Sequence, residues 1–404
     1  MIYMDHAATT KMTPAAVLAM LACCEENWYN PSGIYGPGQR SFEALNSARE
    51  RIAACLNALP EEIIFTSGGS ESDSQAIISA ALVGAKAGKK HILSTAFEHH
   101  AVLRTLKRLE KEGYIIELLD VHPNGIVSAA QVEKAIRKDT CLVTVMYANN
   151  EIGSIQPVSE IGAICRKRGV LFHTDAVQAA GHIPIDVRAQ SIDLLSLSGH
   201  KFHGPKGIGV LYARHGVPVT KPIEGGEQEH GRRAGTENVP AIMGMAAALE
   251  ESCAHMAEDA KRVSVLRDRL IAGLAEIPGA VINGDLENRL PGNVNVSFEG
   301  IEGESLVLLL DERGICASSG SACSSSSLAP SHVLLAIGQS SKLASGALRL
   351  SLLAENTDSD VVAALRVIPE LVRELRGRTS PQSPLTSHRT KYTETSCNVL
   401  IVRL

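Results

Sequence analysis

Short apolar runs alternate with helix-like segments from about Pro60 to Arg214. Seven of these runs are continuous in valine, isoleucine and leucine rather than alternating, which is typical of strands covered on both faces of a sheet. They span residues 62–67, 91–96, 114–121, 141–148, 169–176, 192–198 and 207–214. The stretches between them show helical periodicity and several end in glycine, a common helix C-cap. The pattern predicts an α/β fold with a mostly parallel, seven-stranded sheet.

Near Glu251 the pattern changes to a long charged helix, predicted over 258–279. A second section with α+β character follows, and its clearest elements span 292–300, 304–314 and 347–353. A chain of 404 residues exceeds the size at which single cores stop growing, which favours two domains. We expect a large domain over 16–256, a smaller α+β domain from 1–15 with 257–378, and a disordered polar tail over 379–404.

Composition narrows the class of protein. A formal net charge of −5 argues against direct nucleic-acid binding, which needs a basic face. No long apolar run predicts a membrane span, and the N-terminus shows no secretory leader. The nine cysteines are odd in number and lack framework spacing, which indicates reduced thiols and a cytoplasmic setting.

Polar residues gather after the predicted strands, where open α/β sheets bind their ligands. The turn over 66–72 reads TSGGSES and starts a helix, so its amides suit a phosphate, although an ordinary helix cap explains it as well. Asp175 ends the fifth strand and Gln178 follows it, whereas 98–100 and 149–151 follow two others. An acidic residue in the position of Asp175 is either a helix cap or the partner of a protonated ring nitrogen. This convergence predicts a ligand site.

The segment 196–207 reads SLSGHKFHGPKG and follows the sixth strand. Alone it fits a solvated loop, but a lysine here can also form a Schiff base with a carbonyl cofactor. Lys201 directly follows the strand and turn, so we favour it over Lys206, which follows a rigid Gly-Pro. A metal on His200 and His203 lacks a third nearby ligand and is disfavoured. A Schiff-base lysine, a carboxylate and a phosphate cup together predict pyridoxal 5'-phosphate as the cofactor.

The ordered motifs of the chain resemble a known family. They run from Tyr3 to Thr357 and read YMDHAATT, NPSG, FTSGGSES, EHHAV, NNEIG, HTDAVQ, SGHKFHGPKGIG, GGEQEHGRRAGTEN, SSGSACSS and SHVLLAIG. The chain is similar to the cysteine desulfurases of the NifS/IscS type, in the class V branch of the fold-type I enzymes that use pyridoxal phosphate. The resemblance implies a fold-type I, transferase-like large domain that binds this cofactor.

The resemblance also implies roles for the residues around the cofactor. Lys201 would carry the Schiff base, Asp175 would pair with the pyridinium nitrogen, and Gln178 would hydrogen-bond the phenolic oxygen. His99 would stack on the ring and act as an acid or base, and Asn150 would lie near the same edge and the substrate. The implied phosphate cup consists of Gly69, Ser70, Ser198, Gly199 and His200.

Two further positions imply the substrate and the assembly. Arg349 matches the arginine that binds the substrate carboxylate, a bidentate task suited to guanidinium. Thr236 matches a residue that reaches the phosphate from a second subunit. The resemblance therefore implies L-cysteine as the substrate and a homodimer with shared active sites.

Cys323 lies among glycine, serine and alanine, where an exposed thiolate can react, whereas an inert small residue such as Cys316 is the plain alternative. The resemblance implies that Cys323 takes the substrate sulfur as a persulfide after Lys201 or His99 moves the Cα proton, leaving alanine. The sulfur would pass to an acceptor such as an iron–sulfur scaffold protein. No resident metal is expected, and Cys323 is the one residue open to a cluster in a scaffold complex.

Some positions depart from the family pattern. Ser74 stands where asparagine is common, and Tyr35 stands where histidine is common. The rivals are a selenocysteine lyase, a small-molecule aminotransferase, and a catalytically silent scaffold that keeps the fold. An aminotransferase has no use for a loop thiol, and a silent scaffold has no need of Lys201, Asp175 and Arg349.

Overall fold

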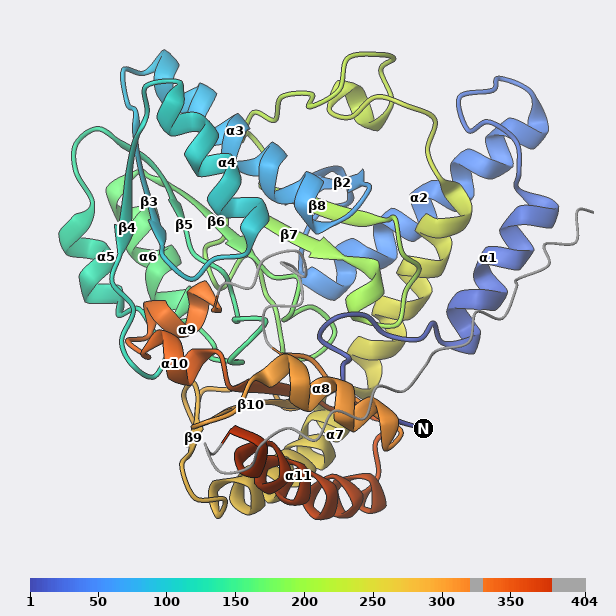
Figure 1. Ribbon diagram of the computed structural model, residues 1–404. Coiled ribbons are helices and arrows are strands. Elements are labelled where there is room, and N and C mark those ends of the chain that lie inside the picture. The colour runs from blue at the N-terminus through green and yellow to red at the C-terminus, as the bar shows by residue number, and fades with distance from the viewer. Residues whose placement is uncertain (320–329, 380–404) are drawn as a thin grey trace, which may run out of the picture.

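The computed structural model describes residues 1–319 and 330–379. A seven-stranded sheet with the order β2-β8-β7-β6-β5-β3-β4 forms its centre (Figure 1). The strands are β2 (Ile63–Thr66), β3 (His91–Thr95), β4 (Ile115–Leu119), β5 (Thr140–Thr144), β6 (Leu171–Asp175), β7 (Leu194–Ser198) and β8 (Gly209–Ala213). β8 runs antiparallel to both of its neighbours, β2 and β7, and the other neighbouring pairs are parallel. All seven predicted strands and the mostly parallel sheet are confirmed.

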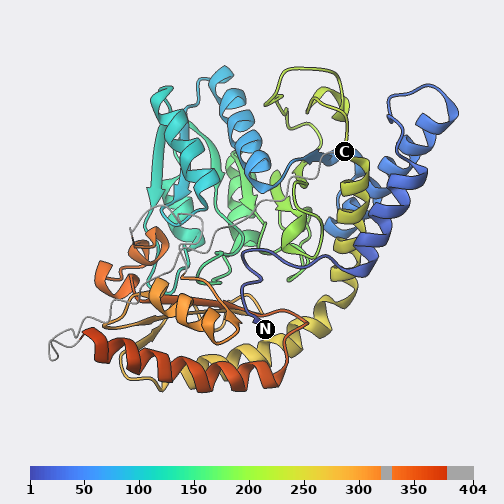
Figure 2. The same cartoon turned by 45° about the vertical axis from the view of Figure 1, so that its right-hand side comes forward.

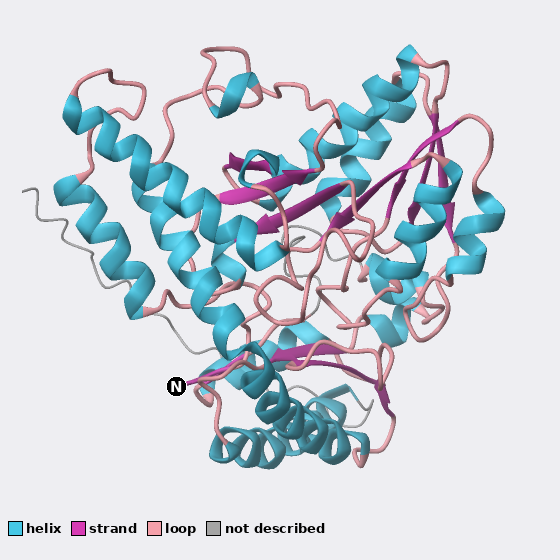
Figure 3. Cartoon of the chain, turned by 180° about the vertical axis from the view of Figure 1, so that it is seen from behind, coloured by secondary structure: helices cyan, strands magenta, loops and turns pink. Residues whose placement is uncertain are grey.

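Helices cover both faces of this sheet, which explains the continuous apolar runs (Figure 3). Neighbouring residues of a strand enter different clusters in most of the sheet; for example, Ile64 packs with residues of the helices on one face, and Phe65 packs into the cluster on the other. One face packs against α3 (Gly69–Lys86) and α4 (His100–Lys111). The helices that contribute to the other cluster include α1 (Pro14–Glu26), α2 (Gly36–Leu56), α5 (Ala129–Ala135) and α6 (Val158–Arg168).

The long helix α7 spans Val239–Ala275, so it begins well before the predicted start at 258. Its first part packs against α1 and α2 and buries residues on several sides, among them Ile242, Ala247 and Ala248. An apolar stretch without a polar face gives no amphipathic signal, so the pattern revealed only the later, charged part of the helix. Figure 2 shows α7 running from α1 and α2 down to the smaller layer.

The smaller layer is built on an antiparallel sheet with the order β12-β10-β9. Its strands are β9 (Ala280–Ile282), β10 (Asn293–Phe298) and β12 (Ala347–Ser351), and its helices are α8 (Gly303–Glu312) and α11 (Asp358–Thr379). These elements and the later part of α7 share one apolar cluster. The N-terminal strand β1 (Ile2–Tyr3) pairs with β11 (Ile315–Cys316), and Met4 is buried in the same cluster. The start of the chain thus lies with its C-terminal half.

The boundary at residue 257 stays a prediction, and two details bear on it. Helix α7 crosses the boundary without a break. The short helices α9 (His332–Ala336) and α10 (Ser341–Ala344) contribute buried residues to the cluster of the large sheet, although 257–378 was assigned to the smaller domain. The predicted tail lies outside the described residues, apart from Thr379 at the end of α11.

Across 1–319 and 330–379, every helix is either too short or too polar to cross a membrane. The seven cysteines in the same ranges are all free thiols. They are Cys23, Cys24, Cys55, Cys141, Cys165, Cys253 and Cys316.

Candidate active site

A cavity of about 390 Å³ lies at the carboxyl ends of the parallel strands β5, β6 and β7. Segments that are far apart in the chain line it, because parallel strands present their ends at one edge of the sheet. These segments are 7–8, 69–73, 146–150, 175–178 and 198–201, joined by His99 and Arg349. The site therefore combines the large sheet, the N-terminal segment and one strand of the smaller sheet.

Lys201 follows β7 directly, at the end of the short 3₁₀ helix η2 (Gly199–Lys201). Its Nζ donates hydrogen bonds to the carbonyl oxygens of Ala7, at 2.6 Å, and Ala8, at 2.8 Å. The carbonyl oxygen of Lys201 lies 2.9 Å from Nε2 of His182, which fixes the backbone at this turn. The amine is thus held at a defined place in the cavity by backbone atoms of the N-terminal segment.

Asp175 is the last residue of β6 and is buried beside the cavity. One of its oxygens accepts a hydrogen bond of 2.9 Å from the amide of Val177. Burial raises the pKa of Asp175, and His99, the Val177 amide and Lys201 oppose that rise. A protonated ring nitrogen placed against this carboxyl would stabilise its anion in the same way.

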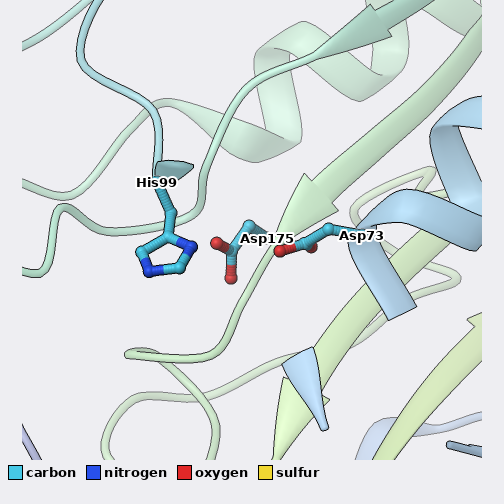
Figure 4. A group of neighbouring side chains, drawn as sticks. All are labelled: Asp73, His99 and Asp175. Carbon is cyan, nitrogen blue, oxygen red and sulfur yellow. The ribbon is translucent and has the colours of Figure 1, made fainter. Parts of the chain in front are cut away.

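His99 is the N-cap of α4, and its Nδ1 accepts a hydrogen bond of 3.2 Å from the amide of Ala101. When the ring is uncharged, its proton is therefore on Nε2. Figure 4 shows Asp175 between His99 and Asp73, and one ligating atom of each lies within 4.8 Å of the others. We call these three side chains, with Lys201, the inner end of the site.

The opposite end of the site is built from the start of α3 and the turn after β7. Gly69, Ser70, Ser198 and His200 line both the first cavity and an adjoining, more open one of about 480 Å³. We call these four residues the outer end. A Cβ on Gly69 would lie 2.6 Å from Cγ2 of Val177, so a side chain there would force a rearrangement.

His200 belongs to this outer end as a neutral ring. Burial, followed by the positive charges of Lys201 and Lys206, lowers the pKa of His200 to about 4. Its Nδ1 lies 3.1 Å from the hydroxyl of Thr9. The outer end thus offers backbone amides, hydroxyls and an uncharged imidazole beside a helix N-terminus, which is a set of groups suited to a phosphate.

Arg349 reaches the cavity from β12 and is almost fully buried. Its Nη1 donates to the carbonyl oxygen of Asn150 at 3.0 Å, and its Nη2 donates to Oδ1 of Asp5 at 2.9 Å. Its Nε has no hydrogen-bond partner among the described residues. Arg349 lines the cavity, and a guanidinium held in place there is suited to a substrate carboxylate.

Most predicted site residues come together. The cavity is lined by Gly69, Ser70, His99, Asn150, Asp175, Gln178, Ser198, His200, Lys201 and Arg349. Gln178 lines it while its Nε2 donates to the carbonyl oxygen of Ala7 at 3.0 Å. Gly199 lies behind the turn, where a Cβ would be 3.0 Å from the carbonyl oxygen of Pro205. Thr236 is exposed and does not line the cavity of its own chain. Cys323 lies outside the described residues.

Three features of the site were missed in the sequence. They are Asp73 next to Asp175, Asp5 next to Arg349, and the carbonyl groups of 7–8 that hold Lys201. Asp73 had a readable signal, because it lies on the same helix face as Ala76 and Ala80, where a charge is unusual. The other two had none, because they depend on contacts between distant parts of the chain.

The residues fit pyridoxal phosphate in three respects. The cavity holds an amine at one place, a buried carboxyl, and a set of groups suited to a phosphate at the start of α3. Gly69 lies so close to Val177 that a side chain does not fit at this position. The N-terminus of α3 is therefore not covered by a side chain of residue 69. Each group matches one part of the cofactor, namely its aldehyde, its ring nitrogen and its phosphate.

The profile of the family "Aminotransferase class-V" matches residues 2–363. The chain is 52% identical to "Cysteine desulfurase IscS" of Methanosarcina thermophila over 385 residues, which cover 95% of this chain and 94% of that protein. It is 48% identical to a "Cysteine desulfurase" of Gluconacetobacter diazotrophicus over 378 residues, covering 93% and 94%.

Two solved structures show the same architecture. A structure described as "NIFS-LIKE PROTEIN" superimposes with a TM-score of 0.87 at 39% identity, covering 93% of this chain and 100% of that one. A second, described as "SspA in complex with cysteine", superimposes with a TM-score of 0.78 at 36% identity, covering 87% and 99%. The two relatives are named cysteine desulfurases, and the two structures share the fold of this chain.

Proposed function

The chain belongs to the aminotransferase class-V family and, within it, to the cysteine desulfurases, and on this premise we propose how its site works. It is an enzyme that depends on pyridoxal phosphate and removes sulfur from L-cysteine to give L-alanine. One observation carries the assignment of its residues: Lys201, Asp175 and Arg349, from three different elements, line a single cavity.

The residues of this chain divide the task of holding the cofactor. Lys201 would hold it through its amine, Asp175 through its ring nitrogen, and the outer end through its phosphate. Gln178 and His99 would contact the ring from the remaining sides. When bound, pyridoxal phosphate supplies an electron sink that makes the Cα proton of an amino acid acidic.

Arg349 binds the carboxylate of L-cysteine and thereby sets the orientation of Cα. Its Nη2 is fixed by Asp5 and its Nη1 by the carbonyl oxygen of Asn150, so the guanidinium is positioned before substrate arrives. Each Nη atom carries a second N–H, which is left to donate to the carboxylate. This preorganisation reduces the ordering cost of binding.

Lys201 and His99 are the groups that move the Cα proton. The amine of Lys201 is held by two carbonyl oxygens, and the ring of His99 has its Nδ1 occupied by the Ala101 amide. His99 therefore acts through Nε2, and Lys201 acts through Nζ. Both atoms belong to residues that line the same cavity as Asp175.

Cys323, outside the described residues, is the proposed sulfur acceptor. Its thiolate attacks the sulfur of the substrate, forming the S–S bond while the bond from sulfur to Cβ breaks. L-cysteine and the enzyme thiol thus become L-alanine and an enzyme persulfide, and the proton count is conserved. The persulfide sulfur then passes to an acceptor such as an iron–sulfur scaffold protein.

A homodimer with shared sites is supported by two observations. Thr236, which the resemblance assigns to the phosphate of a second subunit, is exposed and lies off the cavity of its own chain. Large apolar side chains are also exposed on α1, on α2 and in the connection between them, among them Leu18, Trp28 and Ile34. Such a patch is typical of an interface with another protein chain. The free thiols fit the reducing cytoplasm, where we place the enzyme.

The test is incubation of the purified protein, loaded with pyridoxal phosphate, with L-cysteine and a reductant. We expect alanine and sulfide in equal amounts. Lys201→Ala should abolish both products, and Cys323→Ser should lose sulfide release. A matched control is Cys316→Ser, which should retain both. Full sulfide release by Cys323→Ser, or no alanine from the wild type, would overturn the proposal.

A further inference from the structure

Asp73 is a second carboxyl of the inner end, and the proposed function gives it no role. It lies in α3 and is 1% exposed, against 5% for Asp175. Asp175 lies between it and His99, so Asp73 is on the far side of Asp175 from the ring of His99 (Figure 4). Two buried carboxyl groups therefore lie next to each other in the wall of the cavity, with ligating atoms within 4.8 Å.

The surroundings of Asp73 offer it little compensation for a negative charge. The titratable groups that face it are Asp175, Glu98 and His173, and a hydrogen bond from the hydroxyl of Ser196 is the contact that opposes the rise of its pKa. Nε2 of His173 is 3.6 Å from Oδ1 of Asp73, but that oxygen has no hydrogen-bond partner among the described residues.

His173 does not act as a cation here. Its Nδ1 lies 2.8 Å from the hydroxyl of Thr144, and its Nε2 lies 3.1 Å from that of Ser196. Complete burial lowers the pKa of His173 to about 3, so the ring is neutral at working pH. Glu98 is also buried, and burial raises its pKa to about 8. Asp73 thus faces carboxyl groups, hydroxyls and an uncharged ring.

Two carboxyl groups this close in a dry environment do not ionise together, because each anion repels the other and neither is solvated. Burial, then the charge of Asp175, raises the pKa of Asp73 well above its ordinary value. Asp175 has the better means of carrying the charge, since the Val177 amide donates to it and His99 and Lys201 lie on its side. The shared proton therefore belongs on Asp73.

The geometry points to Asp73 as a positioning residue that stays protonated behind Asp175, so that the pair presents one negative charge, and not two, to the ring nitrogen of the cofactor. This inference rests on the proposed contact between Asp175 and that nitrogen. Its consequence is that asparagine, which is neutral and has the same shape, can replace aspartic acid at position 73 but not at position 175.

The test compares Asp73→Asn and Asp175→Asn in the full chain, with and without pyridoxal phosphate. Titration of the cofactor-free protein should show a dissociation constant for Asp73→Asn within about threefold of the wild type, against a loss of about 30-fold or more for Asp175→Asn. A loss above about tenfold for Asp73→Asn would show that its charge is used, and would overturn the inference.

Thermal melting of the cofactor-free proteins between pH 6 and pH 9 provides a second readout. A carboxyl whose pKa is raised in the folded state costs stability as the pH rises toward that value, because the unfolded chain releases the proton first. The Tm of Asp73→Asn should therefore exceed that of the wild type by an amount that grows with pH. Parallel curves would overturn the inference.

The infrared carbonyl stretch of a protonated carboxylic acid covers the case in which Asp73→Asn does not fold. Burial raises the pKa of Glu98 to about 8 and that of Glu151 to about 7, so both acids would add to this band. We therefore expect the band at neutral pH in the double variant Glu98→Gln, Glu151→Gln, and its absence there would overturn the inference. The failure of the proposed contact is separate: if Asp175→Asn binds the cofactor normally, the role of Asp175 is wrong, while the melting curves still report on Asp73.

Discussion

The two ends of the cavity use opposite means to hold parts of one ligand. The inner end concentrates titratable side chains in a dry pocket, where burial shifts the pKa of Asp73 and Asp175 upward. The outer end is more open and uses the helix N-terminus, the hydroxyl groups of Ser70 and Ser198 and an uncharged imidazole. The first end can change charge during a reaction, whereas the second holds charge without titrating at working pH.

This difference has a physical origin. A charge that must be stabilised on a ring nitrogen needs a counter-charge close by in a low dielectric, where each unit of pKa shift corresponds to about 1.4 kcal/mol. A phosphate brings its own charge, and backbone N–H groups at a helix N-terminus suit it without any buried cation. Substitutions at the inner end should therefore have larger effects than substitutions at the outer end.

The largest effect is expected for Asp175→Asn. An amide cannot stabilise a pyridinium charge, so kcat/KM for L-cysteine should fall about 1,000-fold, equivalent to about 4 kcal/mol. Alanine formation under saturating cofactor measures this loss. Asp175→Glu keeps the charge and should retain more activity than Asp175→Asn. A fall of less than tenfold would place the essential charge elsewhere.

Arg349→Lys should follow in size. Lysine keeps the charge but loses the fork held by Asp5 and Asn150, so KM for L-cysteine should rise about 30-fold while kcat changes less. Initial rates of alanine formation over a range of L-cysteine concentrations separate the two constants. Arg373→Lys, at an exposed position of α11, is the matched control and should leave both unchanged. An unchanged KM in Arg349→Lys would remove Arg349 from the substrate site.

Gly69→Ala should have a moderate effect at the outer end. The new Cβ would lie 2.6 Å from Cγ2 of Val177, so either the start of α3 or Val177 must shift. We expect the cofactor dissociation constant to rise about tenfold and the Tm to fall by a few degrees, since overpacking costs about 1–3 kcal/mol. Gly377→Ala is the control, because nothing lies within 4 Å of the added Cβ. Equal behaviour of the two variants would mean that Val177 moves freely.

The smallest effect is expected for His200→Gln, and it depends on pH. The pKa of His200 is about 4 in the folded protein against 6.5 ordinarily, so the unfolded chain takes up a proton first as the pH falls through that window. The wild type should therefore lose stability from pH 6.5 to pH 4 that the variant keeps, and no difference should develop above pH 7.

Because the ring of His200 is partly exposed, we expect a relative gain in Tm of only about 1–2 °C for His200→Gln over this range. Thermal melting at pH 7 and pH 5 measures it, with His255→Gln on the exposed side of α7 as the control. If the Tm of the variant fell more at acid pH than the Tm of the wild type, the expected direction of the pH effect would be wrong.

Local pattern predicted the large sheet, because a strand buried on both faces is apolar at every position and stands out in any chain. It also placed Asp175 and Lys201, since the first ends such a strand and the second lies three residues after one. Local pattern did not predict the start of α7 at Val239, because a helix buried on several sides has no polar face. Local pattern did not single out Asp73, because its polar neighbours Glu71 and Ser74 are typical of a solvent-exposed start of a helix.

The sequence by itself determined the α/β class, the order of the strands along the chain, and the candidate chemistry of a lysine, a carboxylate and a phosphate cradle. Only the tertiary structure decided which groups meet: Nζ of Lys201 reaches a carbonyl oxygen 194 residues away, and Arg349 reaches a carboxylate 344 residues away. Periodicity in the sequence reports which residues of a segment are buried and which are exposed, by comparing each residue with its near neighbours in the chain. Partners, burial and shared protons arise when distant segments pack together, because a charge is perturbed only by what surrounds it in space.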